Sequence, residues 1–210
     1  MDQSVPRKRK MRGQGASRRG EILAAAKRLF VEDGFQNVTM RGIAAAVGVS
    51  ATALYVYFSD KDAILDAIAA EHFAALAMTL EQSIRPDRPA PENLRAGLRA
   101  YIAFALARPD VYRLTFLRTY RTVPEAECRI VPEAETSFGI LLRSVQDMID
   151  AGYFPAKPAH LMAEALWACA HGIASLLLTL PEKFASDPEI LIEQVVDMSV
   201  NGLRILPLLT

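Results

Sequence analysis

The residues with the most informative chemistry lie between Gly48 and Lys61, in the run GVSATALYVYFSDK. Tyr55 and Tyr57 are two positions apart, so a helix cannot turn both rings towards one face. Each phenol combines an apolar ring with a hydroxyl group, so it can pack against a sugar or a thymine methyl and donate to a phosphate. The pair therefore indicates either contacts with DNA or simple coverage of a small core.

Three nearby side chains also have the chemistry of nucleic-acid contacts. Lys61 lies in the first turn of a predicted helix, where the helix dipole disfavours a cation unless a phosphate binds the same end. Arg41 is long enough to reach a guanine edge, and Thr39 is predicted to cap a helix whose start faces a phosphate. The alternative for Lys61 and Arg41 is an ordinary solvated position on the surface.

A predicted helix-turn-helix positions these side chains. A short helix runs from the Thr39 cap to about Val47, Gly48 permits the tight turn, and Ser50 caps the next helix. Any corner between two helices resembles this pattern, so the residue types on the second helix carry more weight.

The second helix of the pair divides into a buried face and an outward face. Leu54 and Phe58, four residues apart, are predicted to pack inward and to end the helix near Phe58. The side chains that point partly outward are Thr52, Ala53, Tyr55, Val56 and Tyr57. The small residues at its start, Ala51, Thr52 and Ala53, leave it slim enough to enter a major groove with those residues against base edges.

Helical periodicity covers almost all of the chain after Arg18, and no alternating apolar run predicts a strand. We therefore expect an all-α fold of about nine helices. We expect a basic disordered arm at residues 1–17, a three-helix helix-turn-helix domain at 18–62 and a larger helical regulatory and dimerisation domain at 63–210. The spacing of Ser59 and Asp62 predicts a capping box at the start of the fourth helix.

The net charge of the 210-residue chain is zero, but the charge is uneven along it. Residues 1–62 carry 11 Lys and Arg against 6 Asp and Glu, whereas the remainder carries 13 against 18. A basic end of this kind indicates a polyanionic partner. The arm is predicted either to bind phosphates or a minor groove, or to be a solubilising tail. Its cations are Arg7, Lys8, Arg9, Lys10 and Arg12.

The composition argues against several other classes of protein. Cys128 and Cys169 are too few for a disulfide framework, and the N-terminus shows no secretory signal, so we expect a cytoplasmic protein. The two thiols are expected to be buried packing residues, with a redox switch as the alternative. The apolar run from Leu161 to Leu180 contains Glu164 and His171, so a buried helix is expected rather than contact with a membrane.

The sequence shows no constellation typical of an enzyme. It contains no nucleophile with a base and an orienting group, no phosphate-binding loop and no set of metal ligands at the right spacing. We therefore expect no catalytic residues, no metal and no cofactor.

Residues 39–65, TMRGIAAAVGVSATALYVYFSDKDAIL, resemble the DNA-binding signature of the TetR family of bacterial transcriptional regulators. The family pattern T-x-x-x-I-A-x-x-x-G-V-S-x-x-x-L-Y-x-Y-F-x-x-K is matched at every fixed position. The resemblance covers about residues 18–65. It implies a homodimer in which each subunit carries a three-helix DNA-binding head on a larger helical body.

The resemblance also implies roles for individual residues. Those that match the phosphate-binding positions are Thr39, Ser50, Tyr57 and Lys61. Those that match the base-facing positions are Arg41, Ala51, Thr52, Ala53 and Tyr55. Because alanines offer only methyl groups, base specificity is expected to depend on Arg41, Thr52 and apolar contacts with thymine methyls.

Residues 166–176, LWACAHGIASL, resemble a W-x-x-x-H-G element of some TetR-like bodies. Trp167 and His171 share one helix face, so they are either part of an effector pocket or a core tryptophan beside a core histidine. The aromatic residues that could line a pocket with them are Tyr101, Phe104, Tyr112, Phe116 and Phe138, although most of these rings must be core. The segment offers few buried charges, so the expected effector is small and largely apolar.

Small residues on this helix and apolar residues on the last helix predict a dimer interface. They are Ala165, Ala168, Gly172, Leu191, Val195, Met198 and Gly202. A two-fold dimer matches a palindromic operator. The resemblance implies a repressor that a small effector releases from such an operator. The alternatives are an architectural DNA-binding protein without an effector, and an enzyme or small-molecule carrier that uses the body alone.

Overall fold

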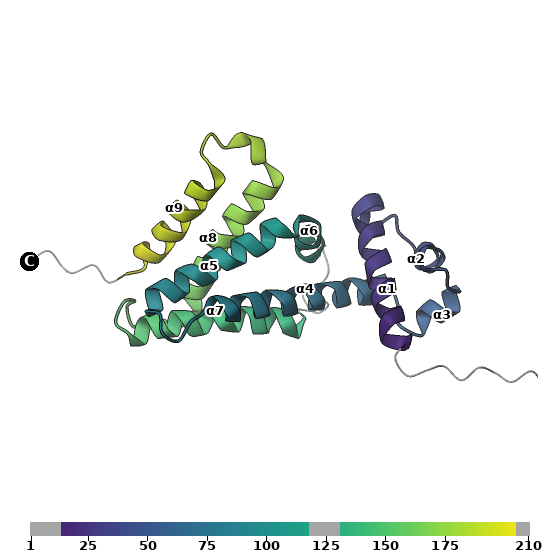
Figure 1. The fold of residues 1–210 in the computed structure, drawn as a ribbon, viewed down its shortest axis with the longest axis horizontal. Coiled ribbons are helices and arrows are strands. Elements are labelled where there is room, and N and C mark those ends of the chain that lie inside the picture. Colours follow the sequence, from purple (N-terminus) through teal and green to yellow (C-terminus); the bar gives the residue numbers. More distant parts are fainter. Residues whose placement is uncertain (1–13, 118–130, 205–210) are drawn as a thin grey trace, which may run out of the picture. The chain divides into compact units, whose positions relative to one another are not determined.

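The computed structural model describes residues 14–117 and 131–204, and every regular element in these ranges is helical (Figure 1). The α-helices are α1 (Gln14–Leu29), α2 (Met40–Val47), α3 (Ala51–Tyr55), α4 (Lys61–Ser83), α5 (Ala90–Ala107), α6 (Pro109–Leu117), α7 (Pro132–Asp150), α8 (Ala159–Thr179) and α9 (Pro188–Gly202). A π-helical turn, Phe30–Gly34, follows α1, and a 3-10 turn, Pro181–Lys183, follows α8. The prediction of an all-α fold with about nine helices is confirmed.

The chain divides into two compact units on either side of the Ile68–Ala69 bond, within α4. We call the unit up to Ile68 the head and the unit from Ala69 the body. The sequence placed the division between residues 62 and 63, where α4 has just begun. Because a continuous helix crosses the division, the local sequence pattern does not mark it.

The head is a small bundle in which α1, α2 and α3 pack in succession. Its core is formed by side chains that are at most 5% exposed: Ile22, Leu23, Ala26, Phe30, Ile43, Ala44, Leu54 and Phe58. Leu54 and Phe58 lie in this core, as their spacing predicted. The helix that carries Leu54 ends at Tyr55, three residues before its predicted end at Phe58.

The start of α4 corrects one prediction from the sequence. The Asp60 carboxylate, not the Ser59 hydroxyl, accepts a hydrogen bond from the Ala63 N–H, with an oxygen–nitrogen distance of 2.7 Å. The Ser59 hydroxyl instead donates to Asp60 at 2.9 Å. A carboxylate is the stronger acceptor and is favoured by the positive end of the helix dipole, which explains why it takes the capping role.

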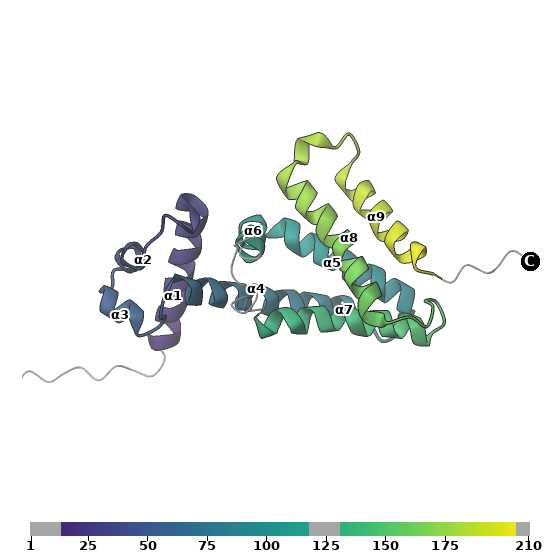
Figure 2. The same ribbon diagram turned by 180° about the vertical axis from the view of Figure 1, so that it is seen from behind.

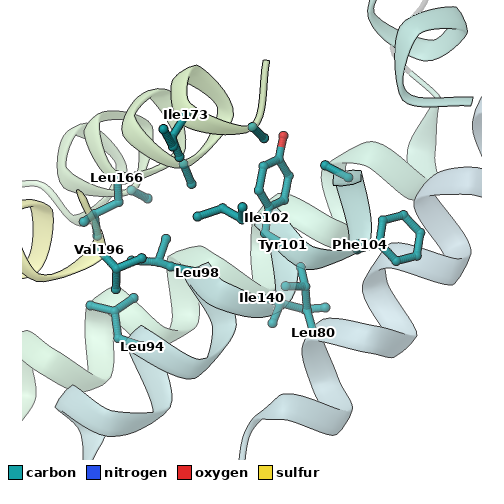
Figure 3. Packing of buried hydrophobic residues seen from close by; sticks show 14 of the residues in the cluster. Leu80, Leu94, Leu98, Tyr101, Ile102, Phe104, Ile140, Leu166, Ile173 and Val196 are labelled. Carbon is teal, nitrogen blue, oxygen red and sulfur yellow. The ribbon is translucent and has the colours of Figure 1, made fainter. Parts of the chain in front are cut away.

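The body is built around α5, which packs against α7, α8 and α9 (Figures 1 and 2). Leu94, Leu98 and Ile102 recur every four residues on α5, and each is at most 3% exposed. Figure 3 shows these side chains facing Leu166 and Ile173 of α8 and Val196 of α9. This layer fixes the positions of α5 and α8, which carry three of the four polar side chains that converge in the body, as described below.

Among the residues that the structure describes, two helices, α4 and α8, are long and apolar enough to cross a membrane by length and composition alone. The core helices of soluble proteins meet the same criterion. In this fold α8 packs against α5, α7 and α9, and it buries Met162, Leu166 and Ile173 among them.

Candidate functional sites

Two hydroxyl groups in the head cap helices and remain accessible. Thr39 Oγ1 accepts from the Gly42 N–H at 3.1 Å, and Ser50 Oγ accepts from the Ala53 N–H at 3.1 Å. Both residues are exposed. Because each hydroxyl oxygen acts as an acceptor in its cap, its own O–H is available to donate outward.

The turn before α3 depends on Gly48, which has a left-handed backbone with φ 71°. Its N–H caps α2 by donating to the carbonyls of Ala44 and Ala45. The turn is followed at once by α3, whose outward residues Thr52, Tyr55 and Val56 are exposed. The other predicted contacts on this segment, Ala51, Ala53 and Tyr57, are half-buried.

Lys61 has partners within the head that the sequence did not reveal. Its Nζ donates to the Phe35 carbonyl at 2.7 Å and to the Gln36 carbonyl at 3.4 Å. The ammonium also lies 4.6 Å from the centroid of the Phe35 ring. An ammonium has three N–H donors, so these contacts leave one available. Lys61 is therefore not a freely solvated cation, since it ties the start of α4 to the segment that follows the π-helical turn.

Arg41 is exposed on α2, and within the described ranges its guanidinium makes no ion pair or hydrogen bond. It is therefore free to reach a ligand. The five arm cations, Arg7, Lys8, Arg9, Lys10 and Arg12, lie outside the described residues.

In the body, four polar side chains from three helices converge. The Tyr112 hydroxyl of α6 lies 2.7 Å from His171 Nδ1 of α8, and the Tyr101 hydroxyl of α5 lies 3.0 Å from the same nitrogen. The Trp167 indole N–H donates to the Tyr101 hydroxyl at 3.3 Å. Figure 3 shows the Tyr101 hydroxyl pointing away from Leu80 and Ile140, which lie on the other side of α5. We call Tyr101, Tyr112, Trp167 and His171 the polar cluster.

The protonation states in the polar cluster follow from its burial. Burial lowers the pKa of His171, so the neutral imidazole is favoured. Burial raises the pKa of Tyr101 to about 12, which keeps this phenol protonated. In the tautomer with an unprotonated Nδ1, this nitrogen has one lone pair and accepts from one hydroxyl, and the shorter distance favours Tyr112 as its donor. The second ring nitrogen, Nε2, then carries the proton.

The other predicted pocket residues surround this cluster to different degrees. The Phe116 ring centroid lies 4.4 Å from that of His171, and the Phe138 centroid lies 6.2 Å from that of Trp167. Phe104 is 4% exposed and packs as core, whereas Trp167 is 40% exposed. A separate groove of about 690 Å³ lies between α5 and α9, and none of the predicted pocket residues lines it.

The predicted dimer residues divide between a free face and the protomer's own core. Ala165, Ala168, Met198 and Gly202 are exposed and Gly172 is half-buried. Leu191 and Val195 are half-buried because they pack against the core of the body.

Further exposed apolar side chains extend the free face on α8. Leu161 is 61% exposed and Leu176 is 44% exposed. With Ala165, Ala168 and Gly172 they recur every three or four residues, which places them on one side of the helix. We call this set the α8 stripe. On α9, which lies beside α8, Ile190 and Met198 are 69% and 63% exposed.

Cys169 and Cys128 were both expected to be buried packing residues. Cys169 is exposed, so the prediction that it is a buried packing residue is wrong, and Cys128 lies outside the described residues. Cys169 follows Ala168 in the sequence and both are exposed, so the exposed surface of α8 extends beyond the α8 stripe. In the ranges 14–117 and 131–204, no three His, Cys, Asp or Glu side chains gather as metal ligands do.

Family models match both units of the chain. Residues 22–68 match a model described as bacterial regulatory proteins of the tetR family. Residues 94–199 match a model described as a tetracyclin repressor-like C-terminal domain.

The named relatives include both a transcriptional activator and a transcriptional repressor. The HTH-type transcriptional activator FasR of Mycolicibacterium smegmatis is 31% identical over 195 residues, which cover 91% of this chain and 85% of that protein. The HTH-type transcriptional repressor AcnR of Corynebacterium diphtheriae is 38% identical over 134 residues, which cover 61% of this chain and 64% of that protein.

Solved structures share the arrangement of the helices. A protein of unknown function from Rhodococcus sp. RHA1 has a TM-score of 0.78 and 26% identity, covering 93% of this chain and 100% of that one. A bacterial regulatory protein in the tetR family, also from Rhodococcus RHA1, has a TM-score of 0.72. At 21% identity, with 90% and 98% of the two chains covered, this second structure shows the fold alone.

Proposed function

Because this chain belongs to the TetR family of bacterial regulatory proteins, we propose that it binds a palindromic operator as a homodimer and that a small, largely apolar effector releases it. The chain is a DNA-binding transcriptional regulator. We propose that it represses its target promoter from the cytoplasm, because a dimer seated on an operator excludes other proteins from the same duplex.

The accessible surface around α3 carries the DNA-binding part of the proposal. The O–H groups of Thr39 and Ser50 are free to donate to phosphates, and so is the third N–H of Lys61. Tyr57 is half-buried, so its ring packs on the head while its hydroxyl is assigned to a phosphate.

The base-facing set lies on the same segments. Arg41 is exposed and is assigned to a guanine edge. Thr52 and Tyr55 are exposed on α3 and are assigned to base edges, whereas the half-buried Ala51 and Ala53 offer only methyl contacts. The arm cations Arg7, Lys8, Arg9, Lys10 and Arg12 would add contacts with phosphates or a minor groove, which would make affinity strongly dependent on salt.

The exposed apolar surface of α8 and α9 supports the homodimer. The α8 stripe contains small residues at its centre, which let a second helix approach closely, and larger apolar side chains at its ends. Ile190 and Met198 on α9 are too exposed to stabilise an isolated protomer. Two copies related by a two-fold axis would bury these surfaces and hold the two α3 helices about 34–36 Å apart or somewhat more on the operator.

The polar cluster supports an effector site in the body. It joins α5, α6 and α8, so a ligand that contacts it would change the packing of three helices at once. The ring of His171 is half-buried among aromatic rings and its Nε2–H can donate to a carbonyl or ether oxygen of an otherwise apolar molecule. A tenfold loss of operator affinity requires only about 1.4 kcal/mol of coupling between the two sites.

The second candidate is that the protein activates its target promoter instead of repressing it, and one observation favours this. The relative matched over 85% of its own length, FasR, is named as an activator. Operator binding and effector release are common to both candidates. Transcription in vitro from the target promoter, with and without the regulator, separates them.

The test uses the purified full chain and duplexes from the region upstream of its own gene. We expect one palindromic duplex to bind selectively at moderate salt. Effectors can be screened by fluorescence because Trp167 is the single tryptophan and belongs to the polar cluster. A compound that quenches Trp167 should also release the duplex, and the His171→Gln variant should respond less. Sequence-indifferent binding would favour an architectural DNA-binding protein instead.

A further inference from the structure

Val56 is the most exposed of the large apolar side chains in the described part of the chain, at 79%. It directly follows α3, and its backbone keeps right-handed helical angles, φ −68° and ψ −28°. The Val56 side chain therefore points in the direction that the next residue of a continued α3 would take. Single exposed apolar residues are common on protein surfaces, so exposure alone does not assign a role. The position of Val56 on the helix is the second observation.

Val56 lies opposite the buried face of α3. With 3.6 residues per turn, each residue advances about 100° around the helix axis. Measured in one direction from Leu54, Val56 therefore lies at about 200° and Thr52 at about 160°. Leu54 and Phe58, which mark the buried face, are 0% and 5% exposed. Thr52 and Val56 are four residues apart and therefore adjacent on the outermost line of the helix. Any groove that receives α3 along its outward face meets these two side chains.

The chemistry of Val56 restricts what it can recognise. A valine side chain has no donor or acceptor, so it can neither bind a phosphate oxygen nor pair with the polar atoms of a base edge. The one apolar feature that a base presents in the major groove is the C5-methyl group of thymine. Thr52 adds a methyl group beside Val56, with a hydroxyl that can contact a neighbouring base.

We propose that Val56, together with the methyl group of Thr52, recognises a thymine C5-methyl group in each half of the operator and so determines base specificity there. This inference rests on the proposed binding of an operator through α3. It adds Val56, whose side chain has no polar atom, to the base-facing set. It also names the residue that makes an apolar contact with a thymine methyl group.

The size of the effect follows from the area of one methyl group. Burial of one methyl or methylene contributes about fourfold in affinity, which corresponds to about 0.8 kcal/mol. A dimer makes the contact twice, so removal of the thymine methyl from both half-sites should weaken binding about 15-fold.

The experiment compares thymine with uracil, which differs only by the C5-methyl group. A binding duplex is first selected from random sequences with the wild-type protein, and each thymine is then replaced by uracil symmetrically in both half-sites. Binding is measured by fluorescence anisotropy for the wild type, for Val56→Ala and for Val31→Ala. Val31 is an exposed valine of the π-helical turn, 41% exposed, and serves as the matched control. Circular dichroism confirms that the variants remain folded, which is expected for changes at exposed positions.

The proposal predicts one thymine position at which uracil weakens the wild type and Val31→Ala about 15-fold. At that position Val56→Ala should lose most of the preference for thymine over uracil and retain only the part contributed by the methyl group of Thr52. If no uracil substitution weakens the wild type, or if Val56→Ala keeps the full preference for thymine, the inference is wrong while operator binding stands. If the wild type selects no duplex at all, the proposed function fails and this inference fails with it.

Discussion

Replacement of Lys61 by methionine separates the structural role of one ammonium group from its proposed role in DNA binding. Within the head, Nζ donates to the carbonyls of Phe35 and Gln36 and lies over the Phe35 ring. In the complex, its remaining N–H is proposed to bind a phosphate of the operator. Methionine keeps the length and apolar character of the side chain but removes every donor and the charge.

The expected loss of stability follows from the contacts of Nζ. A hydrogen bond from a charged group contributes about 1.5–3 kcal/mol and an exposed cation–π contact contributes about 0.5–1 kcal/mol. The bond to Phe35 is only part-buried, and solvent screening reduces these values. We therefore expect Lys61→Met to lower the free energy of unfolding by about 2 kcal/mol.

The expected effect on DNA binding is a change in salt dependence. Each phosphate neutralised by a cation contributes about 0.9 to the slope of log affinity against log salt concentration. A dimer loses two such contacts in Lys61→Met, so its slope should become shallower by about 1.8.

The assay combines urea denaturation of the free protein with fluorescence anisotropy across a range of salt concentrations. Lys183→Met, an exposed lysine in the 3-10 turn of the body, controls for the loss of a charge and should change neither quantity. Unchanged stability of Lys61→Met would refute the role of the Phe35 and Gln36 contacts. Lower stability with an unchanged salt slope would show that Lys61 is purely structural and would remove it from the phosphate-binding set.

Three further changes test other parts of the structure. Gly48→Ala should cost about 1 kcal/mol in urea denaturation, because φ is 71° there while an added Cβ meets no atom within 4 Å; an unchanged midpoint would contradict the need for a left-handed residue. The pKa of Tyr101 is about 12 in the fold against 10.0 for the free side chain, so wild-type stability should be intact below pH 10 and fall by about 2–3 kcal/mol as the pH rises to 12. Tyr101→Phe should lack that component of the alkaline decline, and equal declines would mean that Tyr101 does not cause it. Met198→Glu should convert the dimer to monomers in sedimentation experiments, whereas Gln146→Glu on α7 should leave the mass unchanged; a dimeric Met198→Glu would exclude Met198 from the interface.

Local sequence patterns predicted most of the helices because those patterns act over a few residues. Thr39 and Ser50 cap the helices that their positions indicated, and Gly48 adopts the left-handed turn. Asp60 was missed as a cap because Ser59 and Asp62 offered an equally regular spacing, and only the hydrogen-bond geometry separates the two.

The sites depend on contacts that no local pattern contains. Trp167 and His171 were recognised as a pair because they share a helix face. Their hydrogen-bond partners, Tyr101 and Tyr112, are at least 59 residues away in sequence from His171 and meet it only through the packing of α5 and α6 on α8. The carbonyl partners of Lys61 are likewise at least 25 residues away. Such pairings follow from tertiary structure and could not be predicted from spacing.

The central claim is that a dimer of this chain recognises one palindromic DNA sequence through α3. The most direct measurement is the affinity of the purified protein for its selected palindrome and for a shuffled duplex of the same composition, at one moderate salt concentration. We predict one dimer per duplex and a preference of at least about 1,000-fold for the palindrome. Equal affinities for the two duplexes, or binding by a monomer to a single half-site with no gain from the second, would contradict the account.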